Sequence, residues 1–267
     1  MVRQPAVAGQ FYPDDPRRLR KELGEMVTSV DRKRRVVGIV APHAGYVYSG
    51  VVAGSIYGAI EIPRTVLVLC PNHHGFGAPT ALSPDDAWLT PLGAVPVEKR
   101  LSALLQERIP FVTVDTSAHR FEHSLEVQLP FIQFMREDVR IVPLCLGFSD
   151  FEHCRQLGLG IGQVVKAYGE DVLIVASSDM THYESAESAR KKDEQALAAV
   201  LALDGEGLVK VCRQKRITMC GVIPAAVMLE AAKVLGATAA ELVSYRTSGD
   251  VTGDNRQVVA YAAVAVY

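Results

Sequence analysis

The sequence predicts an α/β fold in which a mostly parallel sheet is covered by helices on both faces. Short, strongly apolar runs of strand length recur along the chain, and several of them precede stretches whose apolar residues have helical spacing. The runs are apolar almost throughout, which is typical of strands that are buried on both faces. Together these observations favour alternating strands and helices over an all-helical or all-strand domain.

The expected strands are continuous apolar runs, from VVGIVA near the N-terminus to VVAYAAVAV at the C-terminus. In order, they occupy residues 36–41, 65–70, 111–114, 139–146, 172–176, 242–245 and 258–266. The segment 81–98 contains three prolines and is expected to form loops or a small hairpin.

The expected helices lie between these strands, at residues 15–28, 50–60, 97–109, 124–136, 151–168, 185–202 and 223–235. In the second of them, Gly50, Gly54 and Gly58 recur every four residues. This small-residue stripe predicts that the helix approaches the sheet closely. No linker, repeat or shift in composition divides the chain, so we expect a single domain over residues 1–267.

Composition and charge exclude several classes of protein. The 267 residues are 49% hydrophobic, and 28 basic against 30 acidic side chains leave a formal charge of −2. Neither a nucleic-acid footprint nor a polybasic membrane patch is therefore expected. The N-terminus shows no apolar signal segment, and Pro42 and His43 interrupt the uncharged stretch 36–60. We expect a cytoplasmic protein without a membrane span, with its five cysteines as thiols.

Three of the strongest strands end at histidines. The first reaches His43, the second reaches His73 and His74, and a third reaches Asp179 and His182. The carboxyl ends of parallel strands face one crevice, so these side chains should converge. Imidazole suits iron, copper and zinc, and His43 with one of the neighbouring pair are the first two expected ligands. Adjacent residues of an extended chain point in opposite directions, so the other histidine should line the pocket.

Other residues complete this predicted site. Cys220 precedes an expected helix, where free backbone N–H groups would favour a thiolate, and it is the best candidate for a third metal ligand. Asp179 followed by His182 resembles an orienting carboxylate with an acid/base imidazole. Tyr46 and Tyr48 follow His43 closely enough to form a pocket wall. The segment SGDVTGDN, at 248–255, predicts a turn that could cover the crevice.

A rival motif lies between the second and third strand ends. His119, Glu122 and His123 spell H-x-x-E-H, the inverted zinc-protease motif, whose histidines must share one helical turn. Ser124 is suited to start a helix after His123, which would leave the pair off the helix. His123 and Glu126 are therefore expected near the main crevice, as pocket residues or as supports of the metal ligands. A zinc peptidase remains an alternative.

Six motifs that span the chain in order carry a family resemblance. They are RQPAVAGQFYP at 3–13, APHAGYVYSG at 41–50, PNHHG at 71–75, EHSLEVQLPF at 122–131, SSDMTHY at 177–183 and TSGDVTGD at 247–254. Together they resemble the Memo family, protein B of the AmmeMemoRadiSam set. The resemblance implies a single three-layer α/β/α domain similar to class III extradiol dioxygenases, such as the enzyme that opens the ring of protocatechuate.

The resemblance also implies a ligand set. Those dioxygenases hold Fe(II) with two histidines and a glutamate and use a further histidine as acid/base. On that pattern His43 and His74 match the histidine ligands, and His182 matches the acid/base. Cys220 takes the place of the glutamate. A soft thiolate in place of a carboxylate favours copper or a differently tuned iron, so Fe(II) is the first expectation and copper the alternative.

Two classes of function follow. The first is a metal-dependent redox protein, dioxygenase-like, that acts on a small organic substrate with His182 and Asp179 moving a proton. The second is a non-catalytic module that binds a peptide or protein partner on a dioxygenase scaffold. The resemblance further implies a functional link to the other AmmeMemoRadiSam proteins, and for the animal member a part in signalling.

Overall fold

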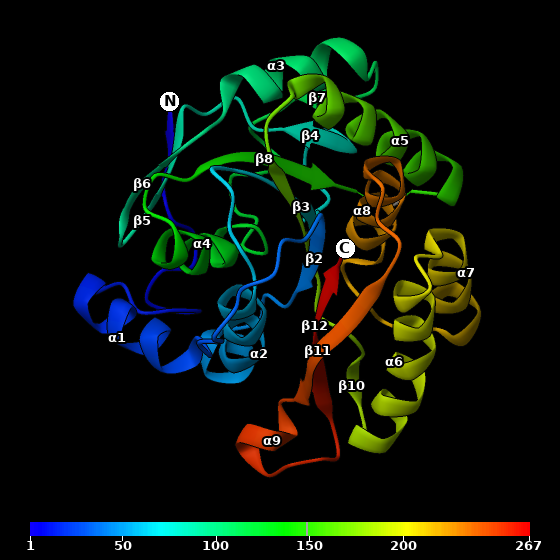
Figure 1. Ribbon diagram of the computed structural model, residues 1–267. Coiled ribbons are helices and arrows are strands. Elements are labelled where there is room, and N and C mark those ends of the chain that lie inside the picture. Colours follow the sequence, from blue (N-terminus) through cyan, green and yellow to red (C-terminus); the bar gives the residue numbers. More distant parts are fainter. Residues whose placement is uncertain (148) are drawn as a thin grey trace.

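The computed structural model describes residues 1–147 and 149–267 and contains one large mixed sheet (Figure 1). Along the sheet the strands follow the order β10-β12-β2-β9-β3-β8-β4-β7, and β11 pairs with β12. Their bounds are β2 Gly38–Ala41, β3 Thr65–Pro71, β4 Thr80–Leu82, β7 Thr113–Val114, β8 Arg140–Leu146, β9 Val172–Ser177, β10 His182–Glu184, β11 Ala240–Thr247 and β12 Val258–Val266.

The centre of the sheet is parallel and its two sides are antiparallel. Strands β2, β9, β3 and β8 run in parallel register, with Gly38 beside Ile174 and Thr65 beside Arg140. Strand β12 is antiparallel to β2, and β4 is antiparallel to β8. The predicted α/β class is therefore confirmed, while the sheet is parallel only in the part that the helices connect by crossovers.

Side chains of the central strands alternate between two apolar cores. In β3, Val66 and Val68 belong to one core, whereas Leu67 and Leu69 belong to the other. All four side chains are fully buried. Successive side chains of a strand point to opposite faces, so this pattern requires a cover of other elements on each face of the sheet.

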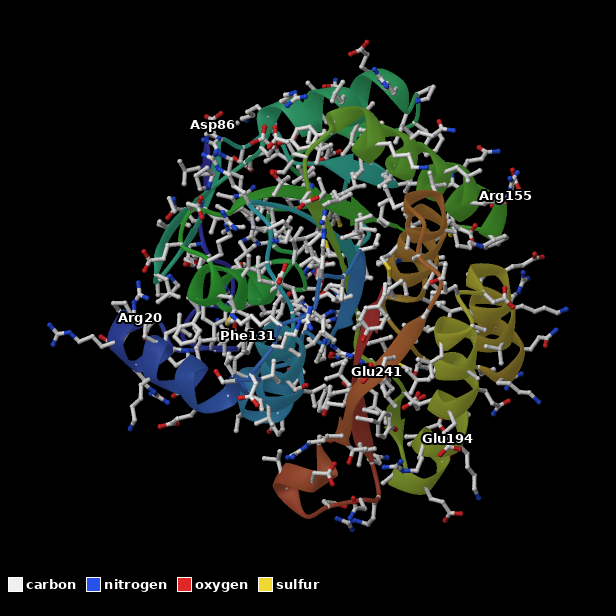
Figure 2. The ribbon with its side chains drawn as sticks, viewed as in Figure 1. Arg20, Asp86, Phe131, Arg155, Glu194 and Glu241 are labelled. Atoms are coloured by element: carbon white, nitrogen blue, oxygen red, sulfur yellow. The ribbon has the colours of Figure 1, made fainter. Side chains whose placement is uncertain are left out.

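The helices supply these covers in two layers. Helices α1, α2 and α4 pack on one face, and α3, α5, α6, α7 and α8 pack on the other (Figure 1). Figure 2 shows Phe131 of α4 inside the molecule and the charged Arg20, Arg155 and Glu194 pointing outward. The bounds are α1 Pro16–Met26, α2 Tyr46–Ala59, α3 Lys99–Arg108, η1 Glu126–Gln128, α4 Leu129–Met135, α5 Phe151–Tyr168, α6 Ala186–Leu201, α7 Gly205–Lys215, α8 Val222–Leu235 and α9 Gly249–Thr252.

Local signals in the sequence explain where several helices begin and end. The Asp15 carboxylate accepts a hydrogen bond from the Arg18 N–H, and Pro16 occupies the first turn of α1. Asp150 caps α5 in the same way, and Gly169 ends it with a φ of 78°. Within residues 1–147 and 149–267, no helix combines the length and the apolar composition that crossing a bilayer requires.

Three features differ from the sequence predictions. Helix α7 was not expected, and neither was the pairing of β1 Val2–Arg3 with β5 Ala87–Thr90. The antiparallel pair of β5 and β6 Gly93–Pro96 is the small hairpin that was one of the two expectations for residues 81–98. The glycine stripe of α2 does not face the sheet. A Cβ on Gly54 or Gly58 would lie 2.2 or 2.1 Å from a backbone oxygen of Met26 or Thr28, so the stripe admits the chain that leaves α1.

Candidate metal centre

The loops after the parallel strands meet at one edge of the sheet. His43 follows β2, His73 follows β3 and Asp179 follows β9, while His123 precedes η1. Because β2, β9 and β3 are neighbours in parallel register, their carboxyl ends are adjacent in space. Residues that are far apart in the sequence are thereby brought together.

Three imidazoles form a compact cluster at this edge. His43, His73 and His123 each offer one ring nitrogen, and these three atoms all lie within 4.8 Å of one another. The ring centroids are 5.3 Å apart for His43 and His73, and 4.8 Å apart for His73 and His123. Within the part of the chain that the structure describes, this is the one such group found among histidine, cysteine and acidic side chains.

A hydrogen-bond chain sets the tautomer of His43. The Ser177 hydroxyl donates to the Ser124 carbonyl at 2.6 Å and accepts from the Gln128 amide at 2.8 Å. Tyr57 donates to the other end of that amide, which fixes its orientation. Ser177 has no second proton to give, so His43 Nδ1, 2.9 Å from Ser177 Oγ, must carry the hydrogen. His43 Nε2 is left with a free lone pair.

A buried carboxylate orients His73. Glu122 lies 2.9 Å from His73 Nδ1 and also accepts the His73 backbone N–H at 2.8 Å. Ser124 donates two further hydrogen bonds to it. Burial alone would raise the pKa of Glu122, but the bonds and charge from His73 and Ser124 hold it well below its usual value. Glu122 therefore stays ionised and accepts a hydrogen bond from His73 Nδ1. Burial lowers the pKa of His73, but the hydrogen bond and charge of Glu122 outweigh it and raise that pKa. His73 Nε2 would therefore bind a metal by giving up its proton.

His123 and His43 are neutral near pH 7. Burial lowers the pKa of His123 to about 4, although the charge of Glu122 opposes this shift. Burial also lowers the pKa of His43 well below its usual value, and His73 and His123 add to that effect. Phe11 packs on the His123 ring with centroids 4.8 Å apart. Neutral imidazoles held this close can bind a metal ion without first losing a proton.

The Cys220 sulfur lies against the same cluster. Its Sγ is 3.2 Å from His43 Nε2 and accepts the Asp179 N–H at 3.2 Å. Since His43 Nε2 is unprotonated, the thiol donates to it. Burial raises the pKa of Cys220, and the nearby Asp179 charge raises it further. These effects outweigh the lowering by the backbone N–H groups of Asp179 and Gly221, so the expected thiolate is not favoured. A metal ion that displaced the thiol proton would convert this contact into a pair of ligands.

The structure brings His73, and not His74, to the cluster. His74 is exposed, its Nε2 lies 3.1 Å from the Phe121 carbonyl oxygen, and its ring stacks on Phe76. Only one of two neighbouring side chains can face His43, and the prediction chose the residue that points away.

Asp179 and His182 both line the cavity, but Asp179 does not orient His182. Asp179 accepts the His43 backbone N–H at 2.7 Å, and burial raises its pKa to about 6 against the opposing effects of that bond and of His182. His182 is held by Thr218, whose hydroxyl accepts the His182 N–H and whose carbonyl lies 2.9 Å from His182 Nδ1. A carbonyl can only accept, so His182 Nε2 carries the free lone pair.

Two predicted pocket residues lie elsewhere. Tyr46 is buried in α2 and donates to the Val127 carbonyl, so Tyr48 lines the cavity instead. Glu126 is fully buried, pairs with Arg3, and accepts hydrogen bonds from Tyr12 and the Ala6 and Val7 N–H groups. It holds the N-terminal segment that carries Phe11, so its influence on the cluster is indirect.

The H-x-x-E-H motif does not form a zinc-protease site. Residues 116–125 form turns rather than a helix, so His119 and His123 do not share a helical turn. The buried His119 contacts the Ala81 carbonyl through Nε2 and packs edge-on against Trp88. Glu122 instead supports His73, a role that the sequence analysis missed. The one signal in the sequence was its place in the motif EHSLEVQLPF, two residues before Ser124, which donates to the same carboxylate.

The cluster opens into a cavity of about 760 Å³, the histidine cavity, whose lining includes His43, His73, His123, Asp179 and His182. The segment 248–257 contributes Ser248, Thr252, Asp254 and Gln257 to this lining, in agreement with the predicted cover over the crevice. The histidine cavity therefore joins a group of metal-binding atoms to a space for a small molecule.

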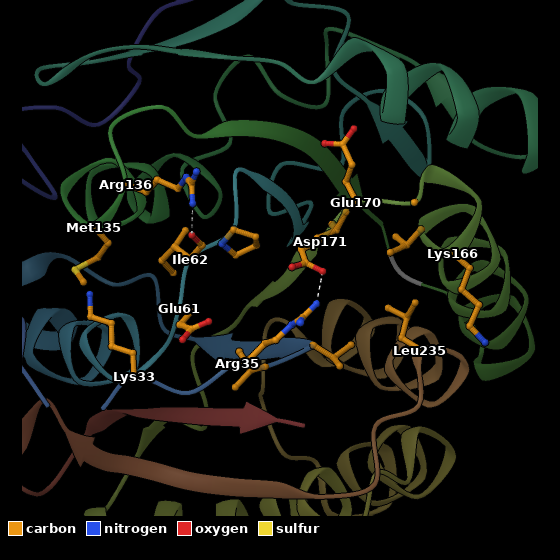
Figure 3. A pocket seen from close by; sticks show the side chains of 16 residues that line it. Lys33, Arg35, Glu61, Ile62, Met135, Arg136, Lys166, Glu170, Asp171 and Leu235 are labelled. Carbon is orange, nitrogen blue, oxygen red and sulfur yellow. Dashed lines mark hydrogen bonds and ion pairs between the residues drawn. The ribbon is translucent and has the colours of Figure 1, made fainter. Parts of the chain in front are cut away.

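A second hollow of about 690 Å³, the basal cavity, lies where the parallel strands begin (Figure 3). Two of its charged side chains have partners within the lining: Arg35 pairs with Asp171, and Arg136 donates to the Ile62 carbonyl. It has no cluster of metal-binding side chains comparable to that of the histidine cavity, as far as the described residues extend.

Comparison with known proteins identifies relatives of this chain. The family model described as Memo-like protein matches residues 3–265. The chain is 45% identical to a MEMO1 family protein of Methanosarcina barkeri over 267 residues, covering 99% of this chain and 100% of that protein. It is 47% identical to one of Aquifex aeolicus, covering 97% of each. An uncharacterized Escherichia coli K12 protein of known structure shares the fold, with a TM-score of 0.59 at 15% identity, over 86% of this chain and 100% of that one.

Proposed function

This chain belongs to the Memo family, and from that premise and its imidazole cluster we propose that it is a metal-dependent redox protein acting on a small organic substrate. The observation that carries the proposal is the convergence of three imidazole nitrogens within 4.8 Å of one another. Buried acceptors hold the outer nitrogens of His43 and His73, which directs Nε2 of each ring towards the metal position.

His43, His73 and His123 would hold the metal, with Cys220 beside His43 as a thiolate ligand once its proton is displaced. A donor set of imidazoles and one thiolate suits iron or copper better than magnesium or calcium. Iron as Fe(II) is the first choice and copper the alternative. Bound there, either metal would supply one-electron exchange and an open position for dioxygen or substrate.

The protein's own part is to bind the substrate and to move a proton. His182 Nδ1 donates to the Thr218 carbonyl, so His182 Nε2 keeps a lone pair that can accept a proton from the substrate. A substrate hydroxyl in the histidine cavity would lose its proton to this nitrogen. Asp179 fixes the backbone of His43, so that the ligand and the base keep their separation during the reaction.

An anaerobic titration with Fe(II) and with copper tests the proposal, because neighbouring histidines provide a matched control. We expect wild type and His74→Ala to bind a single ion per chain with equal affinity, and His73→Ala to lose at least about tenfold in affinity. Cys220→Ser should lose a thiolate-to-metal absorption band. Equal binding by wild type, His73→Ala and Cys220→Ser would end the proposal, and so would a loss confined to His74→Ala.

A further inference from the structure

Aromatic side chains form much of the histidine cavity beyond the imidazole cluster. Phe11, Tyr48, Tyr183 and Tyr261 line it, and they come from the N-terminal segment, α2, β10 and β12. Tyr261 is 2% exposed, whereas Tyr48 and Tyr183 are 41% and 74% exposed. The rings therefore extend from the floor of the cavity to its mouth, a setting that suits a planar ligand.

The hydroxyl groups of these tyrosines set them apart from the rest of the chain. Among the hydrogen bonds of residues 1–147 and 149–267, six of the nine tyrosine hydroxyls have a protein partner: Tyr12, Tyr46, Tyr57, Tyr168, Tyr245 and Tyr267. The other three belong to Tyr48, Tyr183 and Tyr261, and all three line this cavity. A phenol that the fold leaves without a partner is available to a ligand.

Tyr183 is also held in a strained backbone conformation. Its φ is 58°, in the left-handed region that bulky side chains avoid. Its ring contacts that of His182 edge-on, with centroids 5.9 Å apart. Strain of this kind persists where the surrounding structure imposes it, and it concentrates at ligand-binding positions. An exposed tyrosine in this conformation at a cavity mouth is therefore expected to contact the ligand.

The charges of the lining favour one sign of ligand. The residues that line the histidine cavity include Asp179 and Asp254 but neither lysine nor arginine, within the described part of the chain. Asp254 already pairs with Arg256, which leaves Asp179 as the lining acid without a lysine or arginine partner within the described residues. A carboxylate or phosphate on a ligand would find no cationic side chain there. A protonated amine would find a carboxylate and the electron-rich faces of the tyrosines.

We infer that the side chains of the histidine cavity select an aromatic ring that carries a protonated amine over one that carries a carboxylate. The inference rests on the proposed function in that this ring is the substrate of the metal centre. Its selectivity, however, is carried by side chains that do not bind the metal. It also separates this protein from an enzyme for protocatechuate, whose ring bears a carboxylate.

Three ligands with the same phenol ring test the selectivity: tyramine is cationic, tyrosol neutral and 3-(4-hydroxyphenyl)propionate anionic. Calorimetry on the full chain, both metal-free and loaded with Fe(II), measures each affinity. We expect tyramine to bind the metal-free form at least about tenfold more tightly than the propionate does, with tyrosol between them. Fe(II) should narrow this difference, because the ion attracts a carboxylate. Equal or tighter binding of the propionate to the metal-free form overturns the inference, as does an absence of binding by all three.

Variants locate the effect. Tyr183→Ala removes the strained ring, and Tyr48→Phe removes only a hydroxyl; each should weaken tyramine binding, the first by about tenfold. Tyr267→Phe removes a hydroxyl that binds Glu241 outside the cavity and should leave binding unchanged. Unchanged affinity in both cavity variants would contradict the inference. If the protein selects tyramine but binds no metal, the proposed redox function is wrong and this inference stands. If the protein binds metal but does not distinguish the three ligands, this inference is wrong and the proposed function stands.

Discussion

The histidine cavity and the basal cavity have similar volumes and very different chemistry. The histidine cavity, of about 760 Å³, lies where the parallel strands end, and the basal cavity, of about 690 Å³, lies where they begin (Figure 3). In the basal cavity Arg35 and Arg136 find partners in Asp171 and a backbone carbonyl. In the histidine cavity, Ser177 and Glu122 bind the outer nitrogens of His43 and His73, and the inner nitrogens lie in the three-imidazole cluster.

The difference shows that volume does not identify a site in this fold. A site is identified instead by polar side chains whose outer atoms are held by buried protein groups while their inner atoms lie towards the cavity. Loops that follow neighbouring parallel strands can supply such a set, because they start from adjacent points on the sheet edge. Four comparisons between the two regions, or between matched positions, test this view.

The largest expected effect is a difference in stability between two variants. One breaks a buried ion pair near the histidine cavity, and the other breaks an exposed ion pair at the basal cavity. Arg3 is buried with Glu126, 2.5 Å away, and also donates to the His119 and Glu122 carbonyls. Arg3→Met should lower the free energy of unfolding by about 3–5 kcal/mol, because Glu126 would remain buried without its cation. Arg35→Met should leave it nearly unchanged. Urea denaturation measures both, and equal effects would contradict the comparison.

The second effect is a loss of stability in mild acid. Burial lowers the pKa of His119 to about 4, against 6.5 in the unfolded chain. The unfolded state then takes up a proton below pH 6.5 that the folded state does not, so stability falls as the pH drops from 6.5 towards 4. For His119 alone the loss is about 3 kcal/mol. Denaturation of metal-free protein across this range measures it; constant stability would show that His119 is not buried in solution.

The third effect concerns metal affinity. Glu122→Gln should weaken metal binding by about 10- to 100-fold, because a neutral amide holds the His73 imidazole less strongly than the carboxylate does. Glu61→Gln, which changes a carboxylate of the basal cavity, is the matched control and should bind as wild type does. If both variants bind equally well, the carboxylate does not support a metal ligand.

The smallest effect compares two strained positions. Tyr183 and Arg216 have φ values of 58° and 52°, which glycine adopts without strain. Replacing either residue by glycine should raise the free energy of unfolding by about 1 kcal/mol. Only Tyr183→Gly should also weaken tyramine binding, since Arg216 caps α7 away from the cavity lining. Thermal denaturation and calorimetry check the two outcomes. A loss of binding in Arg216→Gly would point to a general change in structure.

Much of the fold could be predicted because apolar runs mark buried strands directly. The strands at β3, β8, β9 and β12 lie where continuous apolar sequence predicts them. Helix α7 escaped because its apolar positions are few and Asp204 begins it right after α6 ends. Strand β4 was not predicted at all. The antiparallel direction of β12 also escaped, because strand direction depends on connections that periodicity does not report.

The site was predicted at the level of segments and missed at the level of single side chains. The ends of the apolar strands predict a site that contains His43, His73, His74, Asp179 and His182. The prediction of His74 as a ligand was wrong because successive side chains of an extended chain point in opposite directions. A shift of one residue therefore exchanges the His73 and His74 rings. The supports of the cluster, Ser177, Gln128 and Glu122, are common polar residues whose role depends on partners 49 or more positions away.

By itself, the sequence determined the α/β class, the family and the loops that carry the chemistry, since apolar runs and local motifs are properties of neighbouring residues. Only the tertiary structure decided which imidazoles meet, which nitrogen each presents, and where Cys220 lies relative to them. Those outcomes depend on strand order and on hydrogen bonds between distant segments. The physical reason is that a ring nitrogen keeps a lone pair for a metal only when the ring's proton lies on its other nitrogen, and hydrogen bonds to distant residues decide where that proton lies.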